Sequence, residues 1–380
     1  MRIMMVILDN RIGGISIRAM AVADKLSKFG IDTFFALPNE LGNLSTRVQG
    51  LGFKVKQITL KRPSLRRPWV NIGWLISLPI SIYLITRIIS KEKIDIIHVN
   101  GLVSIQAPIA AMISRKKVVW HLANTMYPQI FVKILMPLIQ RISFIITISE
   151  SVDEYYCNGK FIRNKRIVRE PVDLNIFNPT KISSLEREAY RKHLGGSERT
   201  FLIGVIGNIV PVKGHEYLIK ALPSILEEKK IKLIIVGATF NTQETYNQKL
   251  RSLVNELGME DRVTFLGQRD DVPQLLAAFD IFVLPSLYEG TPIAILEAMA
   301  MEKPVIATRV GGVQDLVVHT QTGLIVDPED SEVLALASIQ LLNNASLRVS
   351  MGKMGRLRVE KLFSLESCVE AHKEIYRSIK

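Results

Sequence analysis

Two carboxylates stand eight positions apart in a segment that is otherwise almost wholly apolar. The segment LPSLYEGTPIAILEAMAMEKPVIAT spans residues 284–308, and the pair is Glu289 and Glu297. Burying a carboxylate costs free energy unless hydrogen-bond donors meet it. The vicinal hydroxyls of a ribose or another sugar are suitable donors, and donors of the protein itself are the alternative. The pattern therefore raises the hypothesis of a pocket for a sugar or a nucleotide.

The two glutamates are expected in different local structures. The preceding run DIFVLPS is typical of a buried strand, while Thr291 and Pro292 suit the N-cap and the first position of a helix. Glu289 is then expected in the loop beside the positive end of that helix, and Glu297 more than one turn inside it. With one residue in a loop and one in a helix, both can line one pocket.

A lysine stands at the start of another expected helix. In GNIVPVKGH, Lys213 and Gly214 follow an apolar strand. A cation at a helix N-terminus is repelled by the positive end of the helix dipole. A bound diphosphate would make the lysine favourable at this position, because its negative charge attracts both. A solvated lysine is the alternative. The position of this turn matches that of the glycine turn described next, which favours a functional role.

Gly13 and Gly14 lie between the first apolar strand and the first helix. Backbone N–H groups at such a point favour an anion, and a tight turn with positive φ is the alternative explanation. The full G-x-G-x-x-G pattern is absent, and no acidic residue closes a matching second strand. These absences argue against a dinucleotide site.

His98 and His121 end two further apolar runs, where one of them is expected to face a ligand.

Strands and helices alternate in the same order in both halves of the chain. Apolar runs typical of buried parallel strands begin each half and are followed by helical patterns at 15–29 and 215–230. A further helix at 242–258 has Thr242 as its expected cap and Gly258 at its end. Further strand ends are expected in DIIHVNG, KVVWHLA, FIITISE, RVTFLG, KPVIAT and GLIVD. We therefore predict two doubly wound α/β domains.

The boundary between the two domains is expected in EPVDLNIFNP, where prolines bracket a stretch without periodicity. The prediction is an N-terminal domain at 1–175, a second domain at 176–362, and a helix at 363–380 that packs back toward the first. The chain has 380 residues, enough for two cores.

The composition limits the classes of partner. The net charge is +13 and the pI about 9.6, which fits nucleic acid, an anionic membrane or phosphorylated ligands. Lysines and arginines are scattered, which argues against a non-catalytic nucleic-acid-binding protein. Cys157 and Cys368 have no metal-ligand spacing, which indicates a reducing compartment. The N-terminus has too short an apolar run for a signal peptide.

The segment 69–90 follows the basic run KRPSLRRP at 61–68 and is long enough to span a bilayer. Its polar residues favour a core helix, and an amphipathic helix lying on a membrane is also compatible with the pattern.

Taken together, these motifs resemble the retaining GT-B glycosyltransferases of the glycosyltransferase 4 (group 1) family. The resemblance rests on E-x7-E in YEGTPIAILEA, on KPVIATRVGGVQDLV and TGLIVD after it, and on GNIVPVKGHEYLIKAL. Looser matches are the first GG, IIHVNG, SFIITISES and VDLNIFNP. The family implies two Rossmann-like domains facing a central cleft. It also implies transfer from a nucleotide sugar, UDP- or GDP-linked, with retention and without a metal.

The resemblance also implies roles for single residues. Glu297 would bind the ribose hydroxyls, and Glu289 with the following Gly290 and Thr291 would contact the donor sugar. Lys213 would bind the diphosphate and stabilise the charge that develops on it.

Three further positions complete the expected site. The backbone of Gly13 and Gly14 would also meet the diphosphate, and His121 would lie beside the transferred sugar. Asn208 occupies a donor-binding position that often holds arginine in the family. A further departure is the linker, with Glu170 and Pro171 in place of the usual asparagine and glycine.

The expected acceptor is a saccharide or a lipid-linked saccharide, as in surface polysaccharide synthesis. We expect a cytoplasmic protein that is peripheral on an anionic membrane and binds no nucleic acid. An epimerase of the same fold that acts on nucleotide sugars is the alternative enzyme.

Overall fold

The computed structural model describes residues 1–63, 70–123, 125, 127–157, 164–197, 199–239 and 243–380. The chain divides into two compact units. Unit 1 contains residues 1–170 together with the C-terminal segment 365–380, and unit 2 contains residues 171–364. The chain thus leaves unit 1 five residues before the predicted boundary and returns to it at Leu365.

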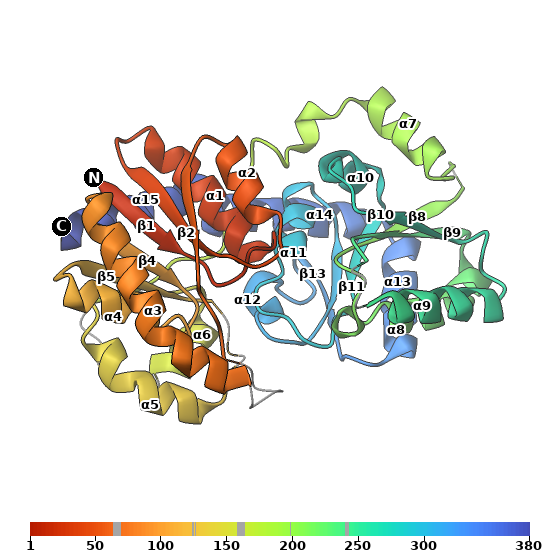
Figure 1. Ribbon diagram of the computed structural model, residues 1–380. Helices are drawn as coiled ribbons and strands as arrows, with labels where there is room; N and C mark the ends of the chain where they lie inside the picture. Colours follow the sequence, from red (N-terminus) through yellow and green to blue (C-terminus); the bar gives the residue numbers. More distant parts are fainter. Residues whose placement is uncertain (64–69, 124, 126, 158–163, 198, 240–242) are drawn as a thin grey trace. The chain divides into compact units, whose positions relative to one another are not determined.

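Unit 1 is a seven-stranded parallel sheet in the order β3-β2-β1-β4-β5-β6-β7 with helices on both faces (Figure 1). Its strands are β1 Arg2–Val6, β2 Asp32–Pro38, β3 Lys54–Ile58, β4 Ile96–Asn100, β5 Lys117–Leu122, β6 Phe144–Thr147 and β7 Lys165–Ile167. Its helices are α1 Gly14–Ser27, α2 Leu44–Gly50, α3 Val70–Lys91, α4 Gln106–Ile113, α5 Gln129–Gln140, α6 Glu150–Cys157 and α15 Leu365–Ile379.

The alternation of side chains along β1 explains the two cores of unit 1. Met4 and Val6 face the core built with α3, α4, α5 and α6. Ile3 and Met5 face the opposite side, which α1, α2 and α15 cover. Because both faces of the sheet are buried, its inner strands are continuous apolar runs rather than alternating ones.

Unit 2 repeats the plan with a six-stranded parallel sheet in the order β10-β9-β8-β11-β12-β13. Its strands are β8 Phe201–Ile206, β9 Ile231–Val236, β10 Val263–Gly267, β11 Ile281–Leu284, β12 Val305–Thr308 and β13 Gly323–Val326. Its helices are η1 Pro179–Lys181, α7 Ser184–His193, η2 Pro211–Lys213, α8 His215–Glu228, α9 Glu244–Glu256, α10 Val272–Ala278, α11 Ile293–Ala300, α12 Val313–Leu316, α13 Ser331–Asn343 and α14 Ala345–Leu362.

Several helix ends differ from their predictions. α11 begins one residue later than expected, because Pro292, and not Thr291, is its N-cap residue, with an extended backbone. Gly30 and Gly258 take the left-handed conformation just after α1 and α9, as helix-ending glycines do. The predicted cap Thr242 lies outside the described residues.

Helix α3 contains most of the predicted segment 69–90. Its C-terminal half is built into unit 1, with Ile85, Ile88 and Ile89 in the core. Apolar side chains of its outer face are 53–68% exposed, namely Ile72, Leu75, Ile76, Ile80 and Tyr83. The core-helix interpretation therefore fits only one face of α3. By length and composition, α3 is also the one described helix that could cross a membrane. The basic run before it is described only at 61–63.

Candidate functional site

The strand order of unit 2 reverses between β8 and β11, and ligands of such sheets bind beyond the carboxyl ends of the strands at that point. The segment 207–214 leaves β8 there, and the loop 285–292 leaves β11 beside it. The two connections are joined by a bond from the backbone N–H of Leu287 to the carbonyl of Val212, at 2.8 Å. Lys213 and Glu289 belong to these two connections.

Lys213 and Glu289 form an ion pair at this edge of the sheet. The Lys213 Nζ lies 2.6 Å from Oε1 of Glu289, and the Oγ of Ser286 donates to the same oxygen at 2.6 Å. The Glu289 side chain is 9% exposed and that of Lys213 is 23% exposed. The pair thus holds the lysine charge in place at the strand ends while part of the lysine side chain stays exposed. A diphosphate is an anion that such a group can bind.

Close backbone contacts surround the ion pair. Gly214 has φ +65°, and a Cβ there would lie 2.0 Å from the carbonyl oxygen of Pro285. Gly311, which follows β12, has φ +47°, and a Cβ there would lie 1.8 Å from the carbonyl oxygen of Glu289. Both positions need glycine for conformation and for space. The loop that carries Glu289 is therefore packed against its two neighbouring connections.

Glu297 lies in α11, a helix with an otherwise apolar buried face. Its side chain is half-buried, and its carboxylate makes no hydrogen bond to any of the residues that the structure describes. Burial raises the pKa of Glu297 to about 7. A partly exposed carboxylate that has no donor among the described residues is free to accept hydrogen bonds from a ligand.

The other donor-binding positions of unit 2 also lie at this edge. Asn208 is exposed two residues after the end of β8, where an amide can meet a ligand. The carbonyl of Gly290 accepts a hydrogen bond from the N–H of Gly312 at 2.8 Å. Thr291 is half-buried beside that turn, and a Cβ on Gly312 would lie 3.3 Å from its Oγ1. The structure thus brings six of the predicted residues together by backbone connection or contact; their ligand roles stay predictions.

Gly13 and Gly14 precede and begin α1 in unit 1, and both are exposed. The backbone of Gly13 is extended, with φ −160°, so the positive-φ turn considered from the sequence does not occur there. A Cβ on Gly13 would meet nothing within 4 Å. Its N–H donates to the Oγ of Ser16 at 2.8 Å, and the predicted contact of this backbone with a diphosphate stays a prediction.

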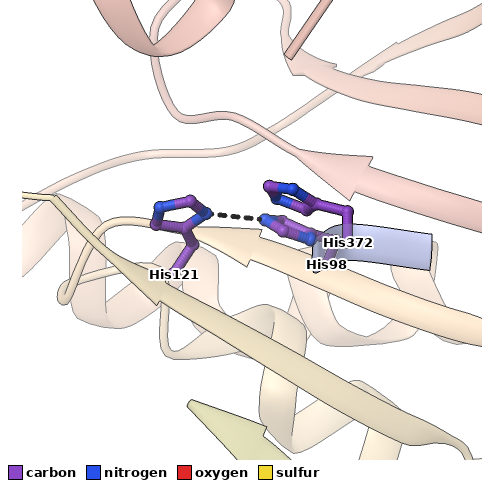
Figure 2. A group of neighbouring side chains, drawn as sticks. All are labelled: His98, His121 and His372. Carbon is purple, nitrogen blue, oxygen red and sulfur yellow. Dashed lines mark hydrogen bonds between the residues drawn. The ribbon is translucent and has the colours of Figure 1, made fainter. Parts of the chain in front are cut away.

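His121 lies in the interior of unit 1, with no exposed surface. Its Nε2 lies 2.8 Å from Nη1 of Arg18, and its Nδ1 lies 3.3 Å from Nε2 of His98. Figure 2 shows His98 and His121 on neighbouring strands, with His372 of α15 beside them. Since both ring nitrogens are occupied, contact of His121 with a transferred sugar would require one of these bonds to open, and that contact stays a prediction.

The direction of the hydrogen bonds follows from Arg18, because a guanidinium can only donate. His121 therefore accepts at Nε2, carries its proton at Nδ1 and donates to Nε2 of His98. His98 in turn carries its proton at Nδ1, which lies 2.7 Å from the Oη of Tyr376 in α15. The result is a directed chain of bonds from α1 through β5 and β4 to the C-terminal helix.

Arg18 also binds the residue at which the chain leaves unit 1. Its Nη1 donates to Oε1 of Glu170 at 2.7 Å, and its Nη2 donates to Asn100 at 2.6 Å. Glu170 is the last residue before the chain enters unit 2. Burial raises the pKa of Glu170 although Arg18 opposes this shift. The departure from the family linker at Glu170 is therefore matched by a buried arginine.

The nitrogens of His98, His121 and His372 lie within 4.8 Å of one another, close enough to consider a shared metal ion. A metal on Nδ1 of His121 would require a proton on Nε2, which would then face the Arg18 donor. The guanidinium charge would also repel a divalent cation. The chemistry of this cluster therefore fits hydrogen bonding better than metal binding.

The three buried histidines predict that unit 1 loses stability in acid. Burial lowers the pKa of His98 and His121 well below the ordinary value, and it lowers that of His372 to about 4. The folded form keeps these rings neutral, whereas the unfolded chain takes up protons below about pH 6.5. Stability is therefore expected to fall as the pH drops from about 6.5 toward 4, with about 3 kcal/mol from His372 alone.

Urea unfolding at pH 7.5, 6 and 5, followed by tryptophan fluorescence, measures this effect in unit 1, because all three tryptophans lie before residue 121. His372→Gln should show a shallower pH dependence than the unaltered protein. The control His193→Gln changes an exposed histidine in α7. Identical pH slopes for the two variants would contradict the prediction.

Comparison with known protein families assigns both halves of the chain. Residues 12–175 match the model described as Glycosyltransferase Family 4, and residues 186–358 match that described as Glycosyl transferases group 1. The chain belongs to the group 1 glycosyltransferases. The predicted fold class, two Rossmann-like domains of the GT-B type, is confirmed.

Relatives and solved structures support this assignment. The chain is 35% identical to N-acetyl-alpha-D-glucosaminyl L-malate synthase of Bacillus anthracis over 50% of this chain and 48% of that protein. It is also 35% identical to a GDP-mannose-dependent monoacylated alpha-(1-6)-phosphatidylinositol monomannoside mannosyltransferase of Corynebacterium glutamicum, over 54% of each chain. The chain thus spans about half the length of these curated relatives. The structure of Anabaena HepE in complex with UDP has the same fold, with a TM-score of 0.85, 23% identity and full coverage of both chains.

Sequence reasoning missed the network around Arg18. The residue lies inside a helical pattern, where an arginine is usually solvated, so the sequence did not indicate that Arg18 is buried. The one available signal was Glu170, an acidic residue in place of the linker residue usual in the family.

Proposed function

We propose that this protein is a retaining glycosyltransferase that moves a sugar, of hexosyl type, from a nucleoside diphosphate sugar to a saccharide or lipid-linked saccharide. One observation carries the proposal: the carboxylate of Glu297, which has no hydrogen-bond donor among the described residues, lies in α11, directly after the loop whose Glu289 holds Lys213. The carboxylate of Glu297 can accept hydrogen bonds from ribose hydroxyls, and the ammonium of Lys213 can bind the diphosphate. A nucleoside diphosphate requires both interactions. A relative named for GDP-mannose and a similar structure solved with UDP support a UDP- or GDP-linked donor.

In the proposed reaction, the Lys213 ammonium stabilises the negative charge that develops on the leaving diphosphate. The leaving phosphate helps to deprotonate the acceptor hydroxyl, which attacks from the same face, so the anomeric configuration is retained. Glu289 keeps Lys213 in position and, with Gly290 and Thr291, contacts the donor sugar. No metal ion takes part in this proposal.

Product analysis tests the reaction. The purified protein is incubated with UDP- or GDP-sugars and a panel of saccharide and lipid-linked acceptors, and the products are analysed by mass spectrometry and NMR. Transfer with retention supports the proposal. A new nucleotide sugar that differs in configuration at one carbon, without transfer, would indicate an epimerase instead. Inverted products would overturn the retaining mechanism.

We propose further that the protein acts in surface polysaccharide synthesis on the cytoplasmic face of a membrane, which α3 contacts. The outer face of α3 carries the exposed side chains of Ile72, Leu75, Ile76, Ile80 and Tyr83. Its inner face belongs to the core of unit 1, which favours a helix lying on the surface over one that spans the bilayer. Lys61 and Arg62 precede it, the latter paired with Asp9 at 3.1 Å, and an unpaired cation near an anionic surface adds about 1 kcal/mol.

Liposome sedimentation is expected to show binding that rises with the fraction of anionic lipid and falls with salt. Ile76→Glu should reduce the bound fraction about tenfold, because a charge replaces a side chain that is 68% exposed on the outer face. The matched control Leu336→Glu changes a side chain of α13 in unit 2 that is 65% exposed. Equal recovery in the soluble fraction with and without anionic lipid would refute membrane contact.

A further inference from the structure

A groove runs between the edge strand β3 and the C-terminal half of α3. It has a volume of about 550 Å³. Its apolar lining on the side of α3 consists of Phe34, Ile58, Leu84 and Ile88, and around the edge of the sheet Phe53 and Val55 also line it. Phe34, Ile58 and Ile88 are themselves buried, so the groove reaches down to the core of unit 1. A cavity of this kind suits a chain of methylene groups, which the apolar lining would remove from water.

The rim of the groove is strongly basic. Lys54, Lys56, Arg87 and Lys91 line it together with a single acid, Glu92. Glu92 already has two cationic partners, Lys54 at 3.8 Å and Arg2 at 4.0 Å. Among the described residues, no acidic partner is recorded for Lys56, Arg87 or Lys91. Three positive charges at the rim of the apolar groove are therefore available to an anionic ligand.

We propose that this groove binds one anionic lipid, with an acyl chain between β3 and α3 and the phosphate at the basic rim. The observation that selects this occupant is the pairing of an apolar interior with three unpaired cations. The groove is also continuous with the exposed face of α3, because Arg87 lies over the ring of Tyr83 at 5.8 Å. The site is distinct from the donor site of unit 2, and its existence does not depend on glycosyl transfer.

An added peptide strand is the main alternative, because in the part of the chain that the structure describes β3 pairs only with β2 and leaves one edge open. Such a strand would bind to the backbone edge of β3 and would not need the space behind it. Lys54 and Lys56 on this edge strand also disfavour pairing with another chain. The lipid uses both the volume and the charge of the groove.

Titration with soluble amphiphiles below their micelle concentration tests the proposal without a membrane. Dodecyl phosphate is the probe, and binding is followed by calorimetry. Inorganic phosphate, hexyl phosphate and zwitterionic dodecylphosphocholine separate the contributions of head group and chain. Dodecyl phosphate is expected to bind at least about tenfold more tightly than each of the three. Equal affinity for inorganic phosphate would leave only an anion site, and equal affinity for dodecylphosphocholine would leave only an apolar one; either result overturns the proposal.

Two kinds of variant locate the site. The double variant K56A/K91A should weaken dodecyl phosphate binding about tenfold, whereas K28A, an exposed lysine beyond α1, should leave it unchanged. Leu84→Trp fills the groove from α3 and should abolish chain-dependent binding. If Leu84→Trp fails to fold, the lysine pair still decides the matter, because its residues are exposed. Unchanged affinity in K56A/K91A would overturn the proposal, while nucleotide binding, measured separately, tests the proposed function alone.

Discussion

Glu297→Gln is expected to bind its nucleoside diphosphate about 10- to 100-fold more weakly than the unaltered protein and yet to be more stable. A carboxylate can accept hydrogen bonds from two ribose hydroxyls, and hydrogen bonds to charged groups contribute about 1.5–3 kcal/mol each. The amide has only one acceptor oxygen and presents donors in place of the other. The loss in affinity is therefore expected even though the two side chains have the same shape.

The gain in stability has the opposite physical origin. Burial raises the pKa of Glu297 from about 4.5 to about 7 in the free protein. A group whose pKa is raised on folding contributes stability at low pH and loses it as the pH rises through the folded value. Near pH 7.5 the ionised carboxylate therefore costs at most about 3 kcal/mol, and glutamine removes this cost.

Calorimetric titration with UDP, GDP, ADP and CMP, followed by urea unfolding at pH 5 and pH 7.5, measures both effects. The stability gain should be about 3 kcal/mol at pH 7.5 and less than about 1 kcal/mol at pH 5. The control Glu332→Gln alters an exposed carboxylate at the start of α13 and should change neither quantity. Unaltered nucleotide affinity in Glu297→Gln would remove Glu297 from the site.

Lys213→Ala is expected to lower turnover about 100-fold or more, because a positioned charge that meets a developing anion contributes about that factor. The structure adds a consequence that the sequence did not indicate. Lys213 is the cationic partner of the buried Glu289 carboxylate, which would retain, among the described residues, only Ser286 as a donor. The single variant should therefore also lose about 1–3 kcal/mol of stability.

A double variant separates the two losses. Lys213→Ala combined with Glu289→Gln removes the unpaired charge and should recover stability, while turnover stays low. Lys220→Ala, an exposed cation in α8, is the control. Turnover is followed as release of the nucleoside diphosphate from the donor identified by titration. Normal turnover in Lys213→Ala would exclude the lysine from the reaction.

The strands that bear on function were predictable because they are buried on both faces. β1, β8 and β11 are continuous apolar runs, and only a covered parallel strand requires that composition. The edge strand β3 was not predicted. Its sequence KVKQI exposes lysines and glutamine to solvent, and such a pattern is weak in isolation.

The same contrast holds for the candidate site. The E-x7-E motif and the turn that carries Lys213 could be recognised from the sequence, because each lies within one strand–loop–helix unit. The 2.6 Å contact between Lys213 and Glu289 joins positions 76 residues apart, and the adjacency of β8 and β11 creates it.

The sequence by itself thus determined the two-domain plan, the family and the glutamates, lysine and glycines of the candidate site, because local composition records burial and turns. Only the tertiary structure decided which of these groups meet and which are enclosed. It buried His121 in the interior of unit 1, where both ring nitrogens make hydrogen bonds, and it paired Arg18 with Glu170, 152 positions away. It also left one apolar face of α3 exposed. Such outcomes depend on contacts between distant segments, and the periodicity of a single segment carries no information about its neighbours in space.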